Sequence, residues 1–212
     1  MRTLDRPRRN LAYGAACIAG FVDATGFLAA SGYFVSFMSG NTTRLGADLA
    51  SAITTAWVPA ALIAGFVVGV IGGALLAEAA QARRKVAVLT LTAALLILAA
   101  TGATLGAPDI AIILLLATAM GTLNNTFQRD GEVAVGLTYM TGALVRMGQG
   151  IAARLTGRSD DGWLAWFGLW LALAGGALGG ALAWRAIGMT GLWIAAIATA
   201  LLAAIAGRIR VP

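Results

Sequence analysis

The amino-acid sequence predicts an all-α, polytopic membrane bundle of six transmembrane helices, arranged as two inverted three-helix repeats. Hydrophobic residues make up 59% of the 212 residues, charged residues only 11%, and the mean hydropathy is +0.84. Soluble domains carry ~25% charged residues. The apolar residues form continuous stretches that suit transmembrane helices of ~20 residues, rather than the alternating pattern of a membrane β-barrel. One polar sequence also occurs twice, once in each half of the chain.

The hydrophobic stretches give three spans in each half of the chain. The expected spans cover about 11–31, 56–77, 86–104, 110–127, 163–184 and 191–206. A Gly-Ala-Pro-Asp turn at 106–109 separates the two halves. We therefore expect one membrane domain that consists of a first repeat, 1–106, and a second repeat, 107–212.

The repeated polar sequence, called the signature below, reads Ser-Phe-Met-Ser-Gly at 36–40 and Thr-Tyr-Met-Thr-Gly at 138–142. The residues around each copy are too polar to face lipid throughout. Each copy is expected to begin a broken helix at membrane depth, or an interfacial helix whose arginine, Arg44 or Arg146, faces the headgroups. A broken helix would present its positive N-terminal end to an anionic ligand group.

The start of the first signature helix contains residues that commonly cap helices. Ser39 or Asn41 is expected to accept hydrogen bonds from free backbone N–H groups there. Thr141 repeats the arrangement in the second copy with a weaker cap.

The charge distribution predicts the orientation of the chain. Because each repeat has an odd number of spans, the second repeat enters the membrane from the opposite side. With a cytoplasmic N-terminus, all of the 15 Lys and Arg residues except Arg44 and Arg185 lie on the cytoplasmic side, as the positive-inside rule requires. Full spans at the signatures would move the basic cluster at 83–85 outside. We therefore expect six spans and two cytoplasmic termini.

Asp23 lies near the middle of the first span, where an ionised carboxylate costs about 2.5–3.5 kcal/mol even on lenient insertion scales. Its counterpart in the second repeat is Asn124, with Asn125 beside it. Asp23 is either a proton or cation carrier, or one partner of a fixed ion pair with Arg44 or Arg146.

These residues predict a polar midplane site between the repeats, and hence a secondary transporter or permeation protein for a small solute or proton. The alternative is a non-transporting membrane scaffold or assembly partner. Since six helices are few for alternating access, a homodimer is expected, and membrane lipid is the other partner. The candidate substrate-binding residues are Asp23, Ser39, Asn41, Arg44, Asn124, Asn125, Tyr139, Thr141 and Arg146.

Several functions have no support in the sequence. The chain has no histidine and a single cysteine, Cys17, so we expect neither a metal site, nor a cofactor, nor a disulfide. It has no catalytic triad and no phosphate-binding loop, so we expect no enzyme activity. The isoelectric point is about 10.7, but the cationic residues are distributed between the spans, which argues against nucleic-acid binding.

Three stretches of the sequence resemble the YoaK family of small bacterial inner-membrane proteins, which carry a domain of unknown function. They are Gly-Phe-Val-Asp-Ala at 20–24, Phe-Val-Ser-Phe-Met-Ser-Gly-Asn-Thr at 34–42 and the second signature. Family members commonly have Met-Thr-Gly-Asn where this chain has Met-Ser-Gly-Asn. The resemblance implies six helices and a bacterial inner membrane, and it implies no activity.

Overall fold

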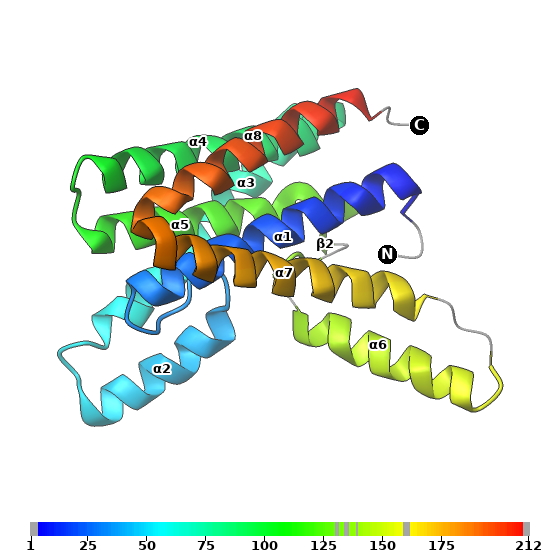
Figure 1. The fold of residues 1–212 in the computed structure, drawn as a ribbon, viewed down its shortest axis with the longest axis horizontal. Coiled ribbons are helices and arrows are strands. Elements are labelled where there is room, and N and C mark those ends of the chain that lie inside the picture. Colours follow the sequence, from blue (N-terminus) through cyan, green and yellow to red (C-terminus); the bar gives the residue numbers. More distant parts are fainter. Residues whose placement is uncertain (1–3, 130–131, 134–135, 139, 159–161, 210–212) are drawn as a thin grey trace.

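The computed structural model describes residues 4–129, 132–133, 136–138, 140–158 and 162–209. Within these residues the chain is almost entirely helical (Figure 1). The α-helices are α1 (Arg6–Ala29), α2 (Met38–Ser51), α3 (Trp57–Ala80), α4 (Arg84–Thr104), α5 (Asp109–Leu123), α6 (Met140–Leu155), α7 (Trp163–Ile187) and α8 (Leu192–Arg208). The two-residue strands β1 (Gln128–Arg129) and β2 (Glu132–Val133) pair antiparallel. The expectation of an all-helical fold is confirmed apart from this short pair.

Four continuous helical stretches are long and apolar enough to cross a membrane. They are Arg6–Ala29, Trp57–Thr104, Asp109–Thr126 and Trp163–Arg208. Two of them are divided by short 3-10 turns, η1 (Gln81–Arg83) between α3 and α4, and η3 (Gly188–Gly191) between α7 and α8. A third turn, η2 (Asn124–Thr126), extends α5. Each of the six expected hydrophobic segments coincides with one helix, α1, α3, α4, α5, α7 or α8.

The turns that divide the long stretches begin where the backbone leaves the right-handed helix. Gly188 follows α7 with φ of 59°. Glycine adopts this left-handed conformation without a steric cost and commonly ends helices. Gln81 follows α3 with φ of 45°, and its side-chain amide donates to the carbonyl of Glu78 over 2.7 Å. At Gln81 and Gly188 the backbone therefore leaves the α-helical conformation, and a 3-10 turn leads into the next helix.

The helices of the two halves are interlocked in matching pairs. α1 packs along α7, and α3 packs along α5, while α4 packs along α8 (Figure 1). Gly20 of α1 lies against the backbone carbonyl of Leu173 in α7, where a Cβ atom would overlap it. Its counterpart Gly121 of α5 lies in the same way against the carbonyl of Phe66 in α3. Such close backbone approach is what small residues allow in membrane helices.

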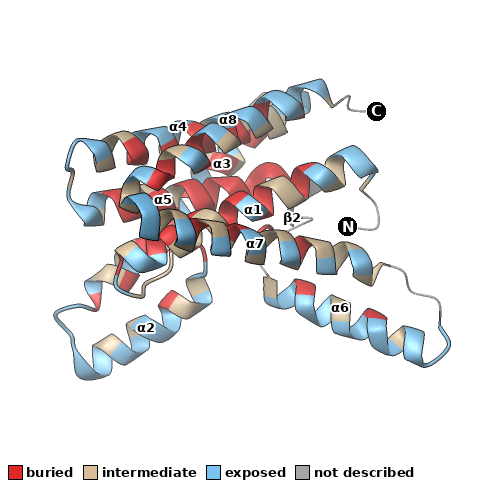
Figure 2. Ribbon diagram, viewed as in Figure 1, coloured by how far each residue is buried: buried red, intermediate tan, exposed pale blue. Residues whose placement is uncertain are grey.

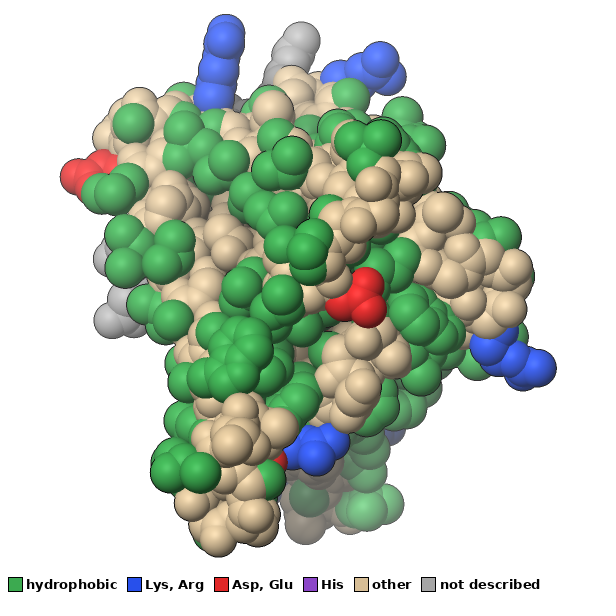
Figure 3. All heavy atoms as spheres, turned by 90° about the vertical axis from the view of Figure 1, so that its left-hand side faces the viewer, with side chains coloured by type: hydrophobic (Ala, Val, Ile, Leu, Met, Phe, Trp, Pro, Cys, Tyr) green, Lys and Arg blue, Asp and Glu red, His purple; other side chains and the backbone are tan. Residues whose placement is uncertain are grey.

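Buried residues gather where α1, α4, α5 and α8 meet, while the outer faces of the helices are exposed (Figure 2). The exposed side chains include large apolar ones such as Val68, Leu75, Leu178 and Leu201. The end of the molecule opposite to both termini is largely hydrophobic, with few charged side chains (Figure 3). Apolar outer faces on helices long enough to span a bilayer are those of an integral membrane protein.

α2 and α6 differ from the other helices. They have 14 and 16 residues and are not among the helices long enough to span the membrane. Most of their residues are exposed, and Asn41 is the one buried residue in α2. Figure 1 shows that the starts of α2 and α6 lie near the middle of the molecule and that the two helices diverge from there. The signature copies stand at these two starts.

Candidate functional site

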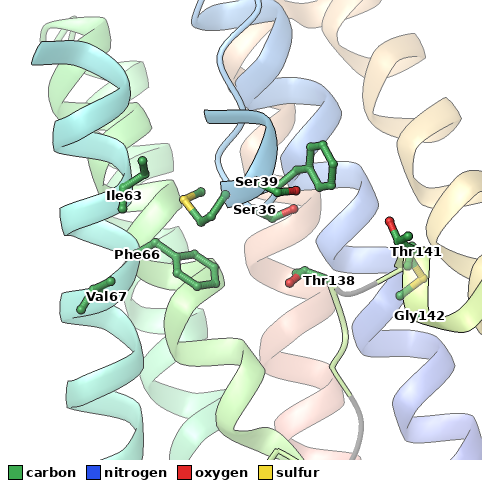
Figure 4. Close-up of a pocket in the computed structure, with 11 residues that line it drawn as sticks. Ser36, Ser39, Ile63, Phe66, Val67, Thr138, Thr141 and Gly142 are labelled. Atoms are coloured by element: carbon green, nitrogen blue, oxygen red, sulfur yellow. The ribbon is translucent and has the colours of Figure 1, made fainter. Parts of the chain in front are cut away.

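A cavity of about 390 Å³ lies where the two signature copies meet (Figure 4). Three segments, far apart in the sequence, line it. The lining residues are Ser36, Phe37, Met38 and Ser39 from the first signature, Thr138, Met140, Thr141 and Gly142 from the second, and Ile63, Phe66 and Val67 from α3. In Figure 4 the α3 residues stand on one side of the cavity, Thr141 and Gly142 on the other, and Ser36 and Thr138 between them.

The cavity wall is apolar with a few hydroxyl groups. Its polar side chains are those of Ser36, Ser39, Thr138 and Thr141, and no charged side chain is among the described lining residues. The α2 start at the cavity has no side-chain cap, so the first backbone N–H groups of α2 are not satisfied by a capping side chain. The site therefore offers hydroxyl groups and the positive end of a helix on an otherwise apolar surface.

Asp23 holds the first signature in place. Its Oδ1 atom accepts hydrogen bonds from the backbone N–H of Ser36 over 2.7 Å and of Val35 over 3.1 Å. These N–H groups lie just before α2 and have no helical partner. A carboxylate that accepts backbone N–H bonds forms stronger bonds than a neutral acceptor does. Asp23 thus joins the last third of α1 to the segment that lines the cavity, and it does not itself line the cavity.

Asn124 makes the equivalent connection in the second half. Its side-chain amide donates to the Thr138 hydroxyl over 3.2 Å, and Thr138 is the counterpart of Ser36. Asn124 also donates to the carbonyl of Met120 over 2.9 Å, and all three residues are buried. In each half, a polar residue near the end of the first helix therefore bonds to the first residue of the signature.

Asn41 is fully buried and bonds to the backbone that precedes α2. Its Oδ1 atom accepts from the Phe34 N–H over 2.9 Å, and its Nδ2 atom donates to the Phe34 carbonyl over 2.6 Å. The expectation that Ser39 or Asn41 caps α2 is wrong. The N-cap residue is Phe37, which makes no side-chain cap bond, because the chain enters the helix two residues earlier than Ser39 and Asn41 turns back to Phe34.

Arg44 and Arg146 are exposed and lie outside the cavity lining. Arg44 donates to the Gly32 carbonyl over 2.9 and 3.2 Å and lies 5.2 Å from the centre of the Tyr33 ring. Arg146 lies 4.8 Å from the ring centre of Trp166 in α7. In the part of the chain that the structure describes, no ion pair joins Asp23 to either arginine.

Tyr33 connects this region to the end of α2. Its hydroxyl donates to the Asp48 carboxylate over 2.6 Å. This hydrogen bond, together with burial, raises the pKa of the Tyr33 phenol above its ordinary value, because it favours the protonated form. Tyr33 therefore stays neutral and holds the segment before the first signature against α2.

The predicted site residues fall into three groups. Ser39 and Thr141 line the cavity. A second group bonds to the signature segments or to the backbone just before them, and it consists of Asp23, Asn41 and Asn124. The third group, Arg44 and Arg146, lies outside the cavity lining. Asn125 donates to the carbonyls of Val70 and Gly121 and so takes part in the contact between α3 and α5. Tyr139 lies outside the described residues.

The sequence prediction missed several residues of the cavity. Ser36 and Thr138 occupy equivalent positions in the repeated signature, so the comparison of the two copies contained the signal for them. Phe37, Met38 and Met140 belong to the same two signature copies, and they also line the cavity. The α3 residues Ile63, Phe66 and Val67 carry no such signal, because their stretch of the sequence is uniformly apolar.

The described residues contain no group of three or more His, Cys, Asp or Glu side chains placed to hold a metal ion. The observed site is therefore a cavity between helices, lined by hydroxyl and apolar groups. Together with the long apolar helices, it defines the chain as a helical membrane protein with a partly open pocket between helices.

The comparison with known proteins places this chain in a family. Residues 11–205 match the family described as "Protein of unknown function (DUF1275)", and the chain belongs to that family. It is 36% identical over 192 residues to the "UPF0700 transmembrane protein RA0705" of Rhizobium meliloti (strain 1021), which covers 91% of this chain and 83% of that protein. No solved structure gives a significant match. The name of this relative indicates a transmembrane protein, and the description of the family gives no activity.

Proposed function

We propose that this protein is a secondary transporter or permeation protein for a small solute, which binds in the cavity between the two signatures. One observation carries the proposal. Two copies of a polar sequence, each at the start of a short helix, line one partly open pocket together with the apolar helix α3. Helix breaks at membrane depth are tolerated where they line a cavity, and in known transporters they form the substrate site.

The lining indicates the chemistry of the solute. A charged solute would find no charged side chain of opposite sign among the described lining residues. The hydroxyl groups and the α2 start instead suit an electron-rich oxygen atom, such as a carbonyl or hydroxyl. An apolar part of the solute would contact the side chains of Phe66, Met38 and Met140. We therefore propose a small amphipathic solute with at least one oxygen acceptor.

Protonation of Asp23 would be coupled to solute binding, because Asp23 bonds to the backbone at the first signature. An ionised Asp23 accepts from the Val35 and Ser36 N–H groups, and a protonated carboxyl is a weaker acceptor. Protonation would then loosen the segment that carries Ser36 at the cavity wall. A proton-coupled solute movement follows from this arrangement.

The membrane orientation is part of the proposal, with six spans, an inverted second repeat and both termini in the cytoplasm. The resemblance to the YoaK family implies six helices and a bacterial inner membrane. Figure 1 supports it, because α1 and α5 run in opposite directions and both termini lie at one end of the molecule. The basic residues Arg8, Arg83 and Lys85 lie together around one cleft. Fluorescent proteins that mature only in the cytoplasm, fused to either terminus, should both fluoresce; a dark fusion at one terminus would contradict the orientation.

The alternative function, a membrane scaffold or assembly partner, rests on a different observation. α2 and α6 expose large apolar side chains, among them Leu49, Val145 and Leu155. A second copy of the chain or another membrane protein could cover these faces in place of lipid. A homodimer would fit either function.

Flux through the protein tests the proposal. Proteoliposomes that contain the protein should swell faster than empty liposomes in at least one small uncharged solute that combines an oxygen acceptor with an apolar body, such as butyramide or 1,2-butanediol. Ser39→Trp, which fills the cavity, should abolish this difference. Thr43→Trp places the same side chain at an exposed position of α2 that does not line the cavity, and it should leave the flux unchanged. Equal swelling with and without protein, or equal loss in both variants, would reject a solute pathway at this cavity.

A further inference from the structure

A second cleft lies at the end of the molecule that carries both termini, away from the signature cavity. Its volume is about 230 Å³. The start of α1 supplies Arg8, the η1 turn and the start of α4 supply Arg83 and Lys85, and the end of α8 supplies Gly207. Two segments that are distant in the sequence, the start of α1 and the η1–α4 junction, thus bring three cationic side chains to one cleft.

The cleft has more positive than negative charge. Among the described residues no acidic side chain lines the cleft, and Asp5 lies beside it, with its Oδ2 atom 3.8 Å from Nε of Arg8. In the described structure, that Nε atom is buried and has no hydrogen-bond partner. A buried N–H of a charged group without an acceptor is costly. An anion in the cleft would supply the missing acceptor.

Two of the three cationic side chains, those of Arg8 and Lys85, are partly buried. Lys85 is half-buried, and its Nζ atom lies 5.6 Å from the ring centre of Phe127, which is itself buried. Arg8 is also half-buried, while Arg83 is exposed. The first turn of α4 borders the cleft through Lys85 and Val86.

We propose that this cleft binds a phosphate group, either that of an anionic lipid headgroup or that of a soluble phosphate compound. A guanidinium group donates two parallel N–H bonds to phosphate oxygens, and an ammonium group adds a point charge. The cleft lies between the ends of apolar helices, where basic pockets of membrane proteins bind anionic headgroups. This site is separate from the signature cavity and does not depend on the transport proposal.

Binding to the purified, delipidated full-length protein in detergent tests the proposal. Native mass spectrometry measures the retention of phosphatidylglycerol, with phosphatidylcholine of the same acyl chains as the zwitterionic control. Thermal unfolding with inorganic phosphate, against chloride at equal ionic strength, measures the soluble source. The test variant is Arg8→Gln/Lys85→Gln. The matched control is Arg6→Gln/Arg208→Gln, which removes the same charge from exposed residues near the same termini but outside the cleft.

We expect the test variant to bind phosphatidylglycerol or phosphate about thirtyfold more weakly, since each basic side chain near an anionic surface contributes a factor of about five. The control variant should stay within about twofold of the wild type. Arg83→Gln, an exposed position, should weaken binding about fivefold and decides the question if the double variant does not fold. Retention of phosphatidylglycerol alone identifies a lipid site, and stabilisation by phosphate alone identifies a soluble ligand. Binding of neither, or equal loss in the test and control variants, would overturn the proposal.

Discussion

At the scale of single residues, the site depends on side chains that bond to backbone rather than to solute. Asp23, Asn41 and Asn124 were each expected around a binding site because polar groups are rare inside apolar spans. In the structure they bond to backbone or hydroxyl groups in the irregular segments that precede α2 and α6. An irregular backbone inside an apolar bundle needs such partners, because an unsatisfied N–H there costs several kcal/mol. Buried polar side chains in these apolar helices therefore indicate where the neighbouring backbone is irregular.

Substitution of Asp23 should separate its acceptor role from its charge. Asp23→Asn keeps an oxygen that can accept from Ser36, and Asn124 shows that an amide suits this position. We expect it to lower the free energy of unfolding by ~1 kcal/mol, since a bond to a neutral acceptor is weaker. Asp23→Ala leaves two N–H groups unsatisfied and should cost ~2–5 kcal/mol. Denaturant unfolding in detergent, followed by tryptophan fluorescence, measures both.

The same experiment contains a control for an ion pair. If Asp23 were paired with Arg44, removing the arginine would restore the stability of Asp23→Asn. We expect no such rescue in Asp23→Asn/Arg44→Gln, because Arg44 bonds to the Gly32 carbonyl. Rescue, or equal stability of the alanine and asparagine variants, would refute the acceptor role.

At the scale of helices, the two halves are joined by glycine contacts that occur in equivalent pairs. Gly121→Ala would place a Cβ atom on the Phe66 carbonyl, so α3 and α5 would have to separate. Such overpacking typically costs ~1–3 kcal/mol. Gly72→Ala in α3 is the matched control, because its Cβ would meet open space, and alanine favours a helix by up to ~1 kcal/mol. Unfolding midpoints should therefore fall for the first variant and stay or rise for the second; a fall of equal size in both would contradict the contact.

The helices themselves could be predicted closely from the sequence, but their neighbours could not. Runs of apolar residues place the second and fifth expected spans within three residues of α3 and α7. α1 begins at Arg6 rather than 11, because Asp5 caps it and accepts from the Arg8 N–H. No pattern in the sequence indicates that α1 packs against α7, or that α3 packs against α5. The lining by Ile63 and Phe66 follows from that pairing, so it could not be predicted.

The surroundings of the signatures were also only partly predictable from the sequence. Their repetition predicted that they belong together, and the structure brings them to one cavity. The sequence also placed Arg44 and Arg146 there, because an arginine one turn into a helix commonly faces the same site as the helix start. In the structure these arginines lie over aromatic rings, Tyr33 and Trp166, on the exposed side. The side of a short amphipathic helix that faces the bundle depends on its neighbours, and composition alone does not fix it.

At the scale of the whole molecule, the central question is whether water reaches the cavity between the halves. Ser39 and Thr141 are exposed lining residues from the two signatures. In a Cys17→Ala background, Ser39→Cys and Thr141→Cys should both react with a small water-soluble thiol reagent, because the thiolate that reacts forms only where water is present. Thr92→Cys, at a fully buried position of α4, and Leu178→Cys, on an exposed apolar face, should stay unmodified in proteoliposomes. Mass spectrometry of the intact protein measures each modification.

If Leu178→Cys reacts, that face is not covered by lipid. If neither signature cysteine reacts in folded protein, the cavity is closed to water from both sides, and a solute pathway through it is excluded.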